Sequence, residues 1–351
     1  MTDLWQAPFR PFFLLAGIAA VAGALPWAFP GATDDPVGLH ARAFLQVWVG
    51  FAAAGYLLTA APHWTGRPPL CGARLPLLAF LGGAAGVAAF ALPDGAARFV
   101  HLVFCAGLGL ALRGPMAAGR RVIALAPWGL GALPFLLDPA GQVLVVTALI
   151  ALIGGAAVPG FLFAAGGRVS RSRIWNLVPP AGILTAVALR GTALPIAAAL
   201  LVTVGGVQVL RLAFWLPLQH WDRPALTMLR LGWLWHGGGL VLVGLSLVDL
   251  GLAPSVAIHA LSVGGMGTMV LALAGRAAMA RTPLGLRPRG MLRSAVGLIC
   301  LAALLRLMAM PLAASWVWGG GWIAFLVALR PALTGAPPHP VLSARRPPHS
   351  A

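Results

Sequence analysis

The stretch IHALSVGGMGTMVLALAGRAAMARTP, residues 258–283, decides the fold class of this chain. The residues between His259 and Arg276 carry no charge. A membrane-spanning helix needs about 20 mostly apolar residues to cross a hydrocarbon core of about 30 Å. The stretch fits that length if the helix begins near Pro254, so it predicts a span over 254–274. A histidine at membrane depth is costly and usually faces a partner or a cavity, which makes His259 a candidate functional residue.

The composition of the whole chain agrees with that stretch. Hydrophobic residues make up 60% of the 351 residues and charged residues only 9%, whereas about 25% of the residues of a soluble domain are charged. This shortfall is spread along the chain and predicts a polytopic membrane protein embedded in a lipid bilayer. The formal net charge is +17, but the arginines stand singly or in short groups between apolar runs. A nucleic-acid-binding face would concentrate the charge, so nucleic acid is not expected as a partner.

Apolar runs separated by arginine, proline and glycine predict an all-α fold with about twelve membrane-spanning helices. Several runs are short, notably 99–112 and 177–189, and only Met310 and Pro311 separate the last two, which could form one kinked helix. The N-terminal run is long enough to span and lacks a convincing cleavage site, so we expect it to be retained as the first helix. The predicted spans are 12–29, 43–61, 75–92, 99–112, 122–137, 141–163, 177–189, 195–217, 231–248, 254–274, 291–310 and 312–329.

The arginines also predict the orientation of these helices, because cytoplasmic loops carry an excess of Lys and Arg. When the loops are assigned alternately to the two sides, 20 of the 24 arginines fall on the side of the termini, which predicts that both termini are cytoplasmic. The loops are short, so residues 1–330 are expected to form a single transmembrane domain. A disordered cytoplasmic tail rich in proline and arginine is expected over 331–351. The arginines on the outer side are Arg42, Arg98, Arg190 and Arg306.

Four histidines lie within or next to the predicted spans. The topology places His40, His101 and His259 near the outer ends of their spans, and His236 about one and a half turns inside the cytoplasmic end of the ninth span. Membrane histidines at similar depth can ligate haem iron or copper through a neutral imidazole. The alternative for each histidine is a hydrogen bond to a neighbouring helix or a place at the headgroup boundary. The sequence leaves both interpretations open.

Other residues that could carry chemistry are sparse. Arg42 follows His40 by two residues and Arg98 precedes His101 by three. Both arginines could therefore pair with haem propionates, although an arginine at a helix end is also ordinary. No predicted span holds a clear acid, which counts against a proton-coupled transporter. The three cysteines show no CxxC spacing, and no phosphate-binding loop, dinucleotide fingerprint or hydrolase motif occurs, so no catalytic residue is assigned.

Four fragments of the sequence resemble a single family. They are FRPFF at 9–13, LLTAAPHWTGRPP at 57–69, GGRV at 166–169, and the tenth span from His259 through Gly264, Gly267 and Met269 to Arg276. In the order and spacing of these fragments and in its twelve predicted spans, the chain resembles the NnrS family. The resemblance implies a bacterial inner-membrane protein that binds haem b and copper. It also implies a link to nitric oxide and denitrification, including tolerance of nitrosative stress.

The sequence departs from the family pattern at three places. The family's WHAHEM-like segment reads LHARAF at 39–44, so one histidine and the glutamate are missing. The GHTGRP segment after the tenth span reads ARTP at 280–283, again without histidine. A histidine expected before the Leu-Gly pair of the ninth span is Arg230 here. The chain therefore resembles a divergent member of the family.

Three functions follow as alternatives. The first is a haem- and copper-binding membrane protein of the nitric-oxide response, with His40 and His259 as ligands, His101 as the next candidate and His236 as a compensating metal ligand. The second is a transporter for a small solute or metal without redox chemistry. The third is a cofactor-less assembly partner of a respiratory complex. Whether the chain catalyses a reaction, and with which proteins it associates, is left open.

Overall fold

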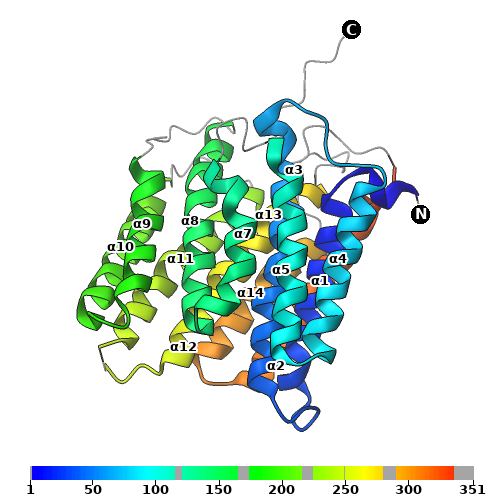
Figure 1. Ribbon diagram of the computed structural model, residues 1–351. Coiled ribbons are helices and arrows are strands. Elements are labelled where there is room, and N and C mark those ends of the chain that lie inside the picture. Colours follow the sequence, from blue (N-terminus) through cyan, green and yellow to red (C-terminus); the bar gives the residue numbers. More distant parts are fainter. Residues whose placement is uncertain are drawn as a thin grey trace. The chain divides into compact units, whose positions relative to one another are not determined.

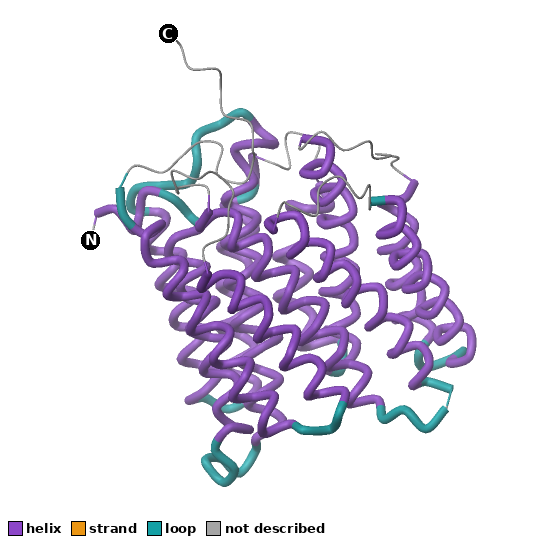
Figure 2. Tube along the Cα trace, turned by 180° about the vertical axis from the view of Figure 1, so that it is seen from behind, coloured by secondary structure: helices purple, strands orange, loops and turns teal. Residues whose placement is uncertain are grey.

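The computed structural model describes residues 2–114, 121–164, 174–215, 224–248, 250–279 and 290–335. These residues form helices joined by turns and loops, and they contain no strand (Figure 1, Figure 2). Ten of the described helices are long and apolar enough to cross a membrane, and two shorter apolar helices cover 121–136 and 174–189. The predicted all-α, polytopic membrane fold is thereby confirmed. The count of twelve spans and the cytoplasmic location of both termini stay predictions.

The chain divides into two compact units. Each unit combines a run of consecutive helices with parts of the helices near the C-terminus. The single domain expected over 1–330 therefore stays a prediction. Unit 1 comprises residues 1–139, 273–292 and 318–351, and unit 2 comprises residues 140–272 and 293–317.

In unit 1, local sequence signals mark the ends of the second span. Asp35 accepts a hydrogen bond from the backbone N–H of Gly38 at 2.8 Å, and Pro36 takes the first helical position, a combination typical of a helix start. The span ends at Gly66, whose φ of 67° lies in the left-handed region that glycine adopts readily. The helices of this unit are η1 (Thr2–Gln6), α1 (Phe9–Ala28), α2 (Pro36–Arg42), η2 (Ala43–Trp48), α3 (Val49–Thr65), α4 (Arg74–Ala91), α5 (Asp94–Ala111), α7 (Arg121–Leu136) and η5 (Arg330–Leu333).

In unit 2, a glycine contact joins α10 and α11. A Cβ at Gly205 would lie 2.6 Å from the carbonyl oxygen of Gly237, and a Cβ at Gly237 would lie 2.9 Å from the carbonyl oxygen of Gly205. Only residues without a side chain allow two helix backbones to approach this closely. The helices of this unit are α8 (Pro139–Ala164), α9 (Ile174–Leu189), α10 (Leu194–Phe214), α11 (Pro224–Ser246), α12 (Pro254–His259) and η4 (Ala260–Gly267). Three further helices belong partly to each unit: α13 (Thr268–Met279), α14 (Gly290–Leu307) and α15 (Pro311–Leu329).

Two of the long helices contain a π-helical segment. The segment η2 lies between α2 and α3 of one continuous helix, and η4 lies between α12 and α13 of another. His40 lies about one turn before the first segment, and His259 is the residue immediately before the second. π-Helical turns are rare and occur frequently at functional sites. Nothing in the sequence patterns predicted either segment.

The structure bears out the two separate spans predicted at the end of the chain and corrects one predicted helix start. The last two spans are separate helices, α14 and α15, and between them Ala309 has a φ of 56°. The helix α11 begins at Pro224 rather than near residue 231, so His236 lies near the middle of that helix. The fragment at 166–169 and the segment at 280–283 lie outside the described residues.

Arg10 ties the two ends of unit 1 together. Its buried guanidinium donates to four backbone carbonyls, which explains why an arginine stands within the apolar FRPFF fragment. Residues 331–335, the start of the predicted tail, are thereby held against α1, whereas 336–351 lie outside the described residues. The acceptors are the carbonyl oxygens of Asp3, Ala332 (3.0 Å), Thr334 (3.0 Å) and Gly335 (2.6 Å).

Candidate functional site

His40, in the last turn of α2, packs against α1 within unit 1. Its Nδ1 lies 3.1 Å from the carbonyl oxygen of Gly23. The imidazole ring meets the edge of Trp27, with ring centroids 6.0 Å apart, and lies 4.8 Å from the ring centroid of Phe44. When Nδ1 donates to this carbonyl, the lone pair of the neutral ring is on Nε2. That tautomer, oriented by a backbone acceptor, is the usual state of a metal-ligating histidine.

The backbone of α1 accommodates this arrangement because residue 23 is glycine. A Cβ at Gly23 would lie 2.7 Å from the ring of Phe44. Phe44 in turn contacts the rings of Trp48 and Trp318, at centroid distances of 6.0 and 5.6 Å. Trp318 donates its indole N–H to the carbonyl oxygen of Ala20 at 2.9 Å, which fixes this aromatic cluster to α1. Sequence reasoning missed the cluster. Its sequence signal is the spacing of four residues between aromatic side chains, as between Phe44 and Trp48.

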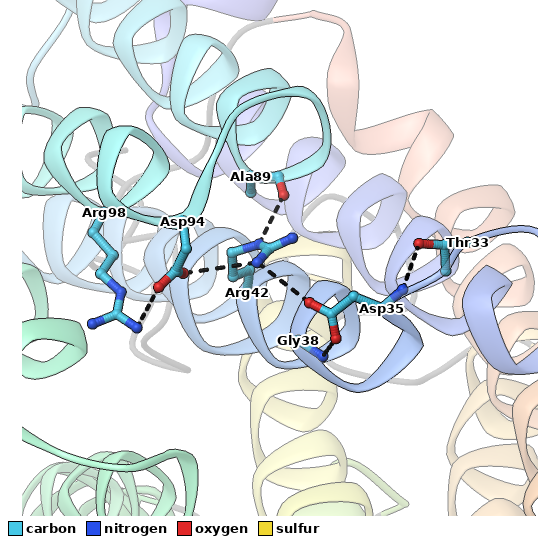
Figure 3. A network of polar contacts seen from close by, with 7 residues as sticks. All are labelled: Thr33, Asp35, Gly38, Arg42, Ala89, Asp94 and Arg98. Atoms are coloured by element: carbon cyan, nitrogen blue, oxygen red, sulfur yellow. Dashed lines mark hydrogen bonds and ion pairs between the residues drawn. The ribbon is translucent and has the colours of Figure 1, made fainter.

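Arg42 and Arg98 meet at one carboxylate (Figure 3). Asp94 Oδ2 lies 2.5 Å from Nη2 of Arg98, and Asp94 Oδ1 lies 3.8 Å from Nη1 of Arg42. The same Nη1 also lies 3.8 Å from Oδ2 of Asp35. The network thus contains two guanidinium and two carboxylate groups, so its charges balance.

Each of the two arginines also holds a helix end. Arg42 Nε donates to the carbonyl oxygen of Ala89 in α4 at 3.2 Å, and Arg98 Nη1 donates to the carbonyl oxygen of Pro134 in α7 at 2.5 Å. The network therefore links α2, α4, α5 and α7. The expectation that these arginines bind haem propionates stays a prediction, and their partners in this structure are the chain's own oxygens.

Replacing Asp94 by asparagine should lower the free energy of unfolding by about 1 kcal/mol, because Asp94 is half-exposed and exposed ion pairs contribute modestly. The effect should shrink in high salt, which screens exposed charges. Thermal unfolding of the detergent-solubilised protein at low and high salt measures both quantities. Asp34→Asn, at an exposed residue of the loop between α1 and α2, is the matched control and should change neither. A loss that is the same at both salt concentrations would contradict the ion-pair explanation.

His101 has the arrangement of a structural histidine. It is buried in α5, and its Nε2 lies 3.3 Å from the carbonyl oxygen of Leu130 in α7. The thiol of Cys105, one turn along the same helix, lies 3.5 Å from Nε2. The ring of His101 therefore faces α7, whereas the ring of His40 faces α1. A hydrogen bond to a neighbouring helix, one of the two interpretations of the sequence, describes His101 directly.

In unit 2, His259 closes α12 and contacts α14. Its Nδ1 lies 2.6 Å from the carbonyl oxygen of Ser255 and 3.1 Å from Nη2 of Arg306. One nitrogen cannot donate to the carbonyl and accept from the guanidinium at once, so the tautomer selects one of the two bonds. Arg306 was missed as a site residue, although it is one of the four arginines that the topology places on the outer side.

His236 is fully buried in α11. Its ring stacks on that of Trp233, with centroids 5.3 Å apart and an interplanar angle of 25°. Neither ring nitrogen has a hydrogen-bond partner among the described residues. A Cβ at Gly265 would lie 3.0 Å from the Cα of His236, so His236 packs against the far part of η4. Because Gly265 comes six residues after His259, the two histidines lie at different levels of this helix pair.

The candidate ligands are thus distributed rather than gathered. His40, His101, Arg42 and Arg98 belong to unit 1, and His236 and His259 belong to unit 2. Within the described part of the chain, no three or more His, Cys, Asp or Glu residues lie close enough to hold a metal ion together. Haem can be held by a single imidazole, whereas a metal ion held by protein ligands alone needs three or four of them. Separate histidines therefore fit haem better than such a metal ion.

A family of known proteins matches most of the chain. The family model described as NnrS protein matches residues 3–336. No match to this chain was found among the curated proteins. The matched range includes every histidine and arginine of the candidate site.

Proposed function

This chain belongs to the NnrS family, and we propose that it is a haem-binding protein of the bacterial inner membrane that acts in the nitric-oxide response. In this proposal haem b is held through His40 or His259. The response covers denitrification and tolerance of nitrosative stress. Family membership and the membrane-spanning helices support the proposal at its broadest level.

A shared local arrangement of His40 and His259 carries the proposal. Each histidine lies within about one turn before a π-helical segment, and each places Nδ1 on a backbone carbonyl oxygen, at 3.1 and 2.6 Å. With Nδ1 protonated, the lone pair that could bind iron is on Nε2 in both residues. A backbone acceptor on the other ring nitrogen is the support that metal-ligating histidines usually have. The arrangement occurs in both units, in helices that are far apart in the sequence.

The residues around these histidines would supply the rest of a haem site. At His40, the rings of Trp27 and Phe44 provide apolar walls. At His259, Arg306 provides a cation that could pair with a propionate. Arg306 would then no longer donate to Nδ1 of His259, which favours the tautomer in which Nδ1–H donates to the carbonyl oxygen of Ser255. A haem held by these residues would supply the capacity to bind small diatomic molecules. The proposal also includes copper, with His236 as a further ligand; among the described residues no group of three or more His, Cys, Asp or Glu surrounds a metal position.

The test is the absorption spectrum of the detergent-purified protein, oxidised and then reduced with dithionite, after expression with haem supplied. We expect a b-type haem signal that is lost in His40→Gly or in His259→Gly. Added imidazole should restore the signal in the variant that removes the ligand, because free imidazole can replace the missing side chain. Rescue of this kind separates a ligand from a residue that only supports the fold.

His63→Gly is the matched control, since His63 is an exposed histidine in the last turn of α3 and should leave the spectrum unchanged. A signal that survives both ligand variants would move the ligand to His101 or His236. A wild-type protein without any haem signal, and without copper by elemental analysis, would overturn the cofactor proposal.

A further inference from the structure

Among the described residues, a buried arginine in unit 2 has only neutral partners. Arg211 in α10 is 7% exposed, and none of the ion pairs found among the described residues includes it. Its guanidinium bridges α8, α9 and α10 through four hydrogen bonds to uncharged oxygens. The acceptors are the carbonyl oxygens of Trp175 (2.6 Å) and Gly155 (3.3 Å), the side-chain oxygen of Gln208 (3.1 Å) and that of Asn176 (3.4 Å).

These hydrogen bonds satisfy donors, but no carboxylate in the described part of the chain balances the charge. A charge buried without a counter-charge is strongly unfavourable even after the surroundings relax. The cost is greatest in a membrane-spanning helix, where charged side chains usually pair with one another or line a water-filled path. Arg211 also lies over the rings of Trp215 and Trp233, at 4.8 and 5.6 Å from their centroids, which offsets part of that cost. A bound anion would offset the remainder.

Two further buried groups near Arg211 have nothing to bind among the described residues. The side-chain oxygen of Gln208 accepts from Arg211, so its Nε2 lies beside the guanidinium, and this nitrogen has no described partner. The ring nitrogens of His236 likewise have no described partner. The ring of His236 stacks on that of Trp233. Trp233 donates its indole N–H to the carbonyl oxygen of Gln208 at 3.1 Å. The amide nitrogen of Gln208 and the imidazole N–H of His236 are both hydrogen-bond donors. A ligand that they hold would therefore have to be a hydrogen-bond acceptor.

Adjacent glycines in α8 make room for this cluster. A Cβ at Gly155 would lie 3.3 Å from the side-chain oxygen of Asn176 and 3.5 Å from Nη1 of Arg211. A Cβ at Gly154 would lie 2.8 Å from the ring of Trp233. The backbone of α8 therefore approaches the guanidinium and the indole at consecutive residues.

We propose that Arg211, Gln208 and His236 bind a small monovalent anion of the halide class. The unbalanced charge of one guanidinium calls for one negative charge, and the unpartnered donors supply the hydrogen bonds that hold it. Trp175 and Asn176 stand at the start of α9, and Arg211 near the end of α10, so the anion would enter from the loop side of these helices.

The experiment is equilibrium binding of radiolabelled chloride to the full-length protein in detergent, with gluconate keeping the ionic strength constant. We expect saturable binding of one chloride per chain and a higher unfolding temperature as chloride rises, because a ligand of the folded state stabilises it. Gln208→Glu places a carboxylate beside Arg211 and should weaken chloride binding at least tenfold. The same variant should unfold at a temperature at least as high as that of the chloride-free wild type.

Two matched variants complete the test. Gln142→Glu introduces the same carboxylate thirteen residues before Gly155 in α8, about 20 Å away along the helix, and should bind chloride as the wild type does. Asp222→Asn removes the acid nearest to Arg211 in sequence and should also leave chloride binding unchanged. The absence of saturable binding in the wild type would overturn the proposal. So would undiminished binding in Gln208→Glu, or binding that appears only when Asp222 is removed.

Discussion

Replacing Gly205 by alanine is expected to destabilise the protein by about 3 kcal/mol, the upper part of the range for overpacking a close contact. A Cβ at this position would lie 2.6 Å from the carbonyl oxygen of Gly237 and 2.7 Å from the backbone nitrogen of Val241. Both atoms belong to the backbone of α11, so no side-chain rotation can relieve the overlap. The two helices would have to separate, and the contacts of α10 with α11 on either side would be lost.

The matched control is the next residue of the same helix. A Cβ at Gly206 would meet nothing within 4 Å, and alanine is the better helix former by roughly 0.5–1 kcal/mol. Gly206→Ala should therefore be neutral or stabilising. Thermal unfolding of both variants in the same detergent, followed by circular dichroism, measures the difference. Equal unfolding temperatures for the two variants would rule out the close helix contact.

Replacing Arg10 by methionine is expected to cost about 3 kcal/mol, because a hydrogen bond that involves a charged group contributes about 1.5–3 kcal/mol and several are lost here together. Methionine keeps the apolar stem but not the guanidinium, which donates to four backbone carbonyls. Those carbonyls join residue 3 and residues 332–335 to α1. Without the guanidinium, these carbonyl oxygens would need water as their hydrogen-bond donor. The segment after α15 should therefore detach while the helices remain folded.

Hydrogen exchange followed by mass spectrometry measures this detachment. The amides of residues 332–335 should exchange faster in Arg10→Met, including that of Gly335, which donates to Oδ2 of Asp3 at 2.9 Å. Arg330→Met is the control, because Arg330 lies in the same segment and its side chain is exposed. It should leave both exchange and unfolding unchanged. Unchanged protection of the segment in Arg10→Met would mean that other contacts hold it in place.

The candidate site was only partly predictable. His40 and His259 stand out in the sequence because polar residues are rare in apolar runs, and rarity is visible without a structure. Their partners are not visible in this way. Gly23 lies 17 residues before His40, and Arg306 lies 47 residues after His259. Such contacts depend on which helices pack against each other. This pairing cannot be deduced from any single segment, because the apolar helices are similar in composition.

The arginines show the same division. Counting them by loop predicts an orientation, because that rule concerns only which side of the membrane each loop faces. The count cannot show that Arg42 and Arg98 share Asp94, or that the described partners of Arg211 are all neutral. It also treats Arg211 as one more charge near a helix end, although the structure buries it between three helices.

The sequence by itself determined that this protein is an all-α, multi-pass membrane protein of the NnrS family. Length and apolarity are properties of one segment at a time, and family fragments are read along the chain. Only the tertiary structure decided where the helices contain π-segments, which carbonyl oxygen orients His40 and His259, and which buried arginine has no counter-charge among the described residues. Those features arise from contacts between segments far apart in the sequence. The free energy of these contacts depends on packing distance and on burial away from water. Neither quantity can be deduced from the order of the residues alone.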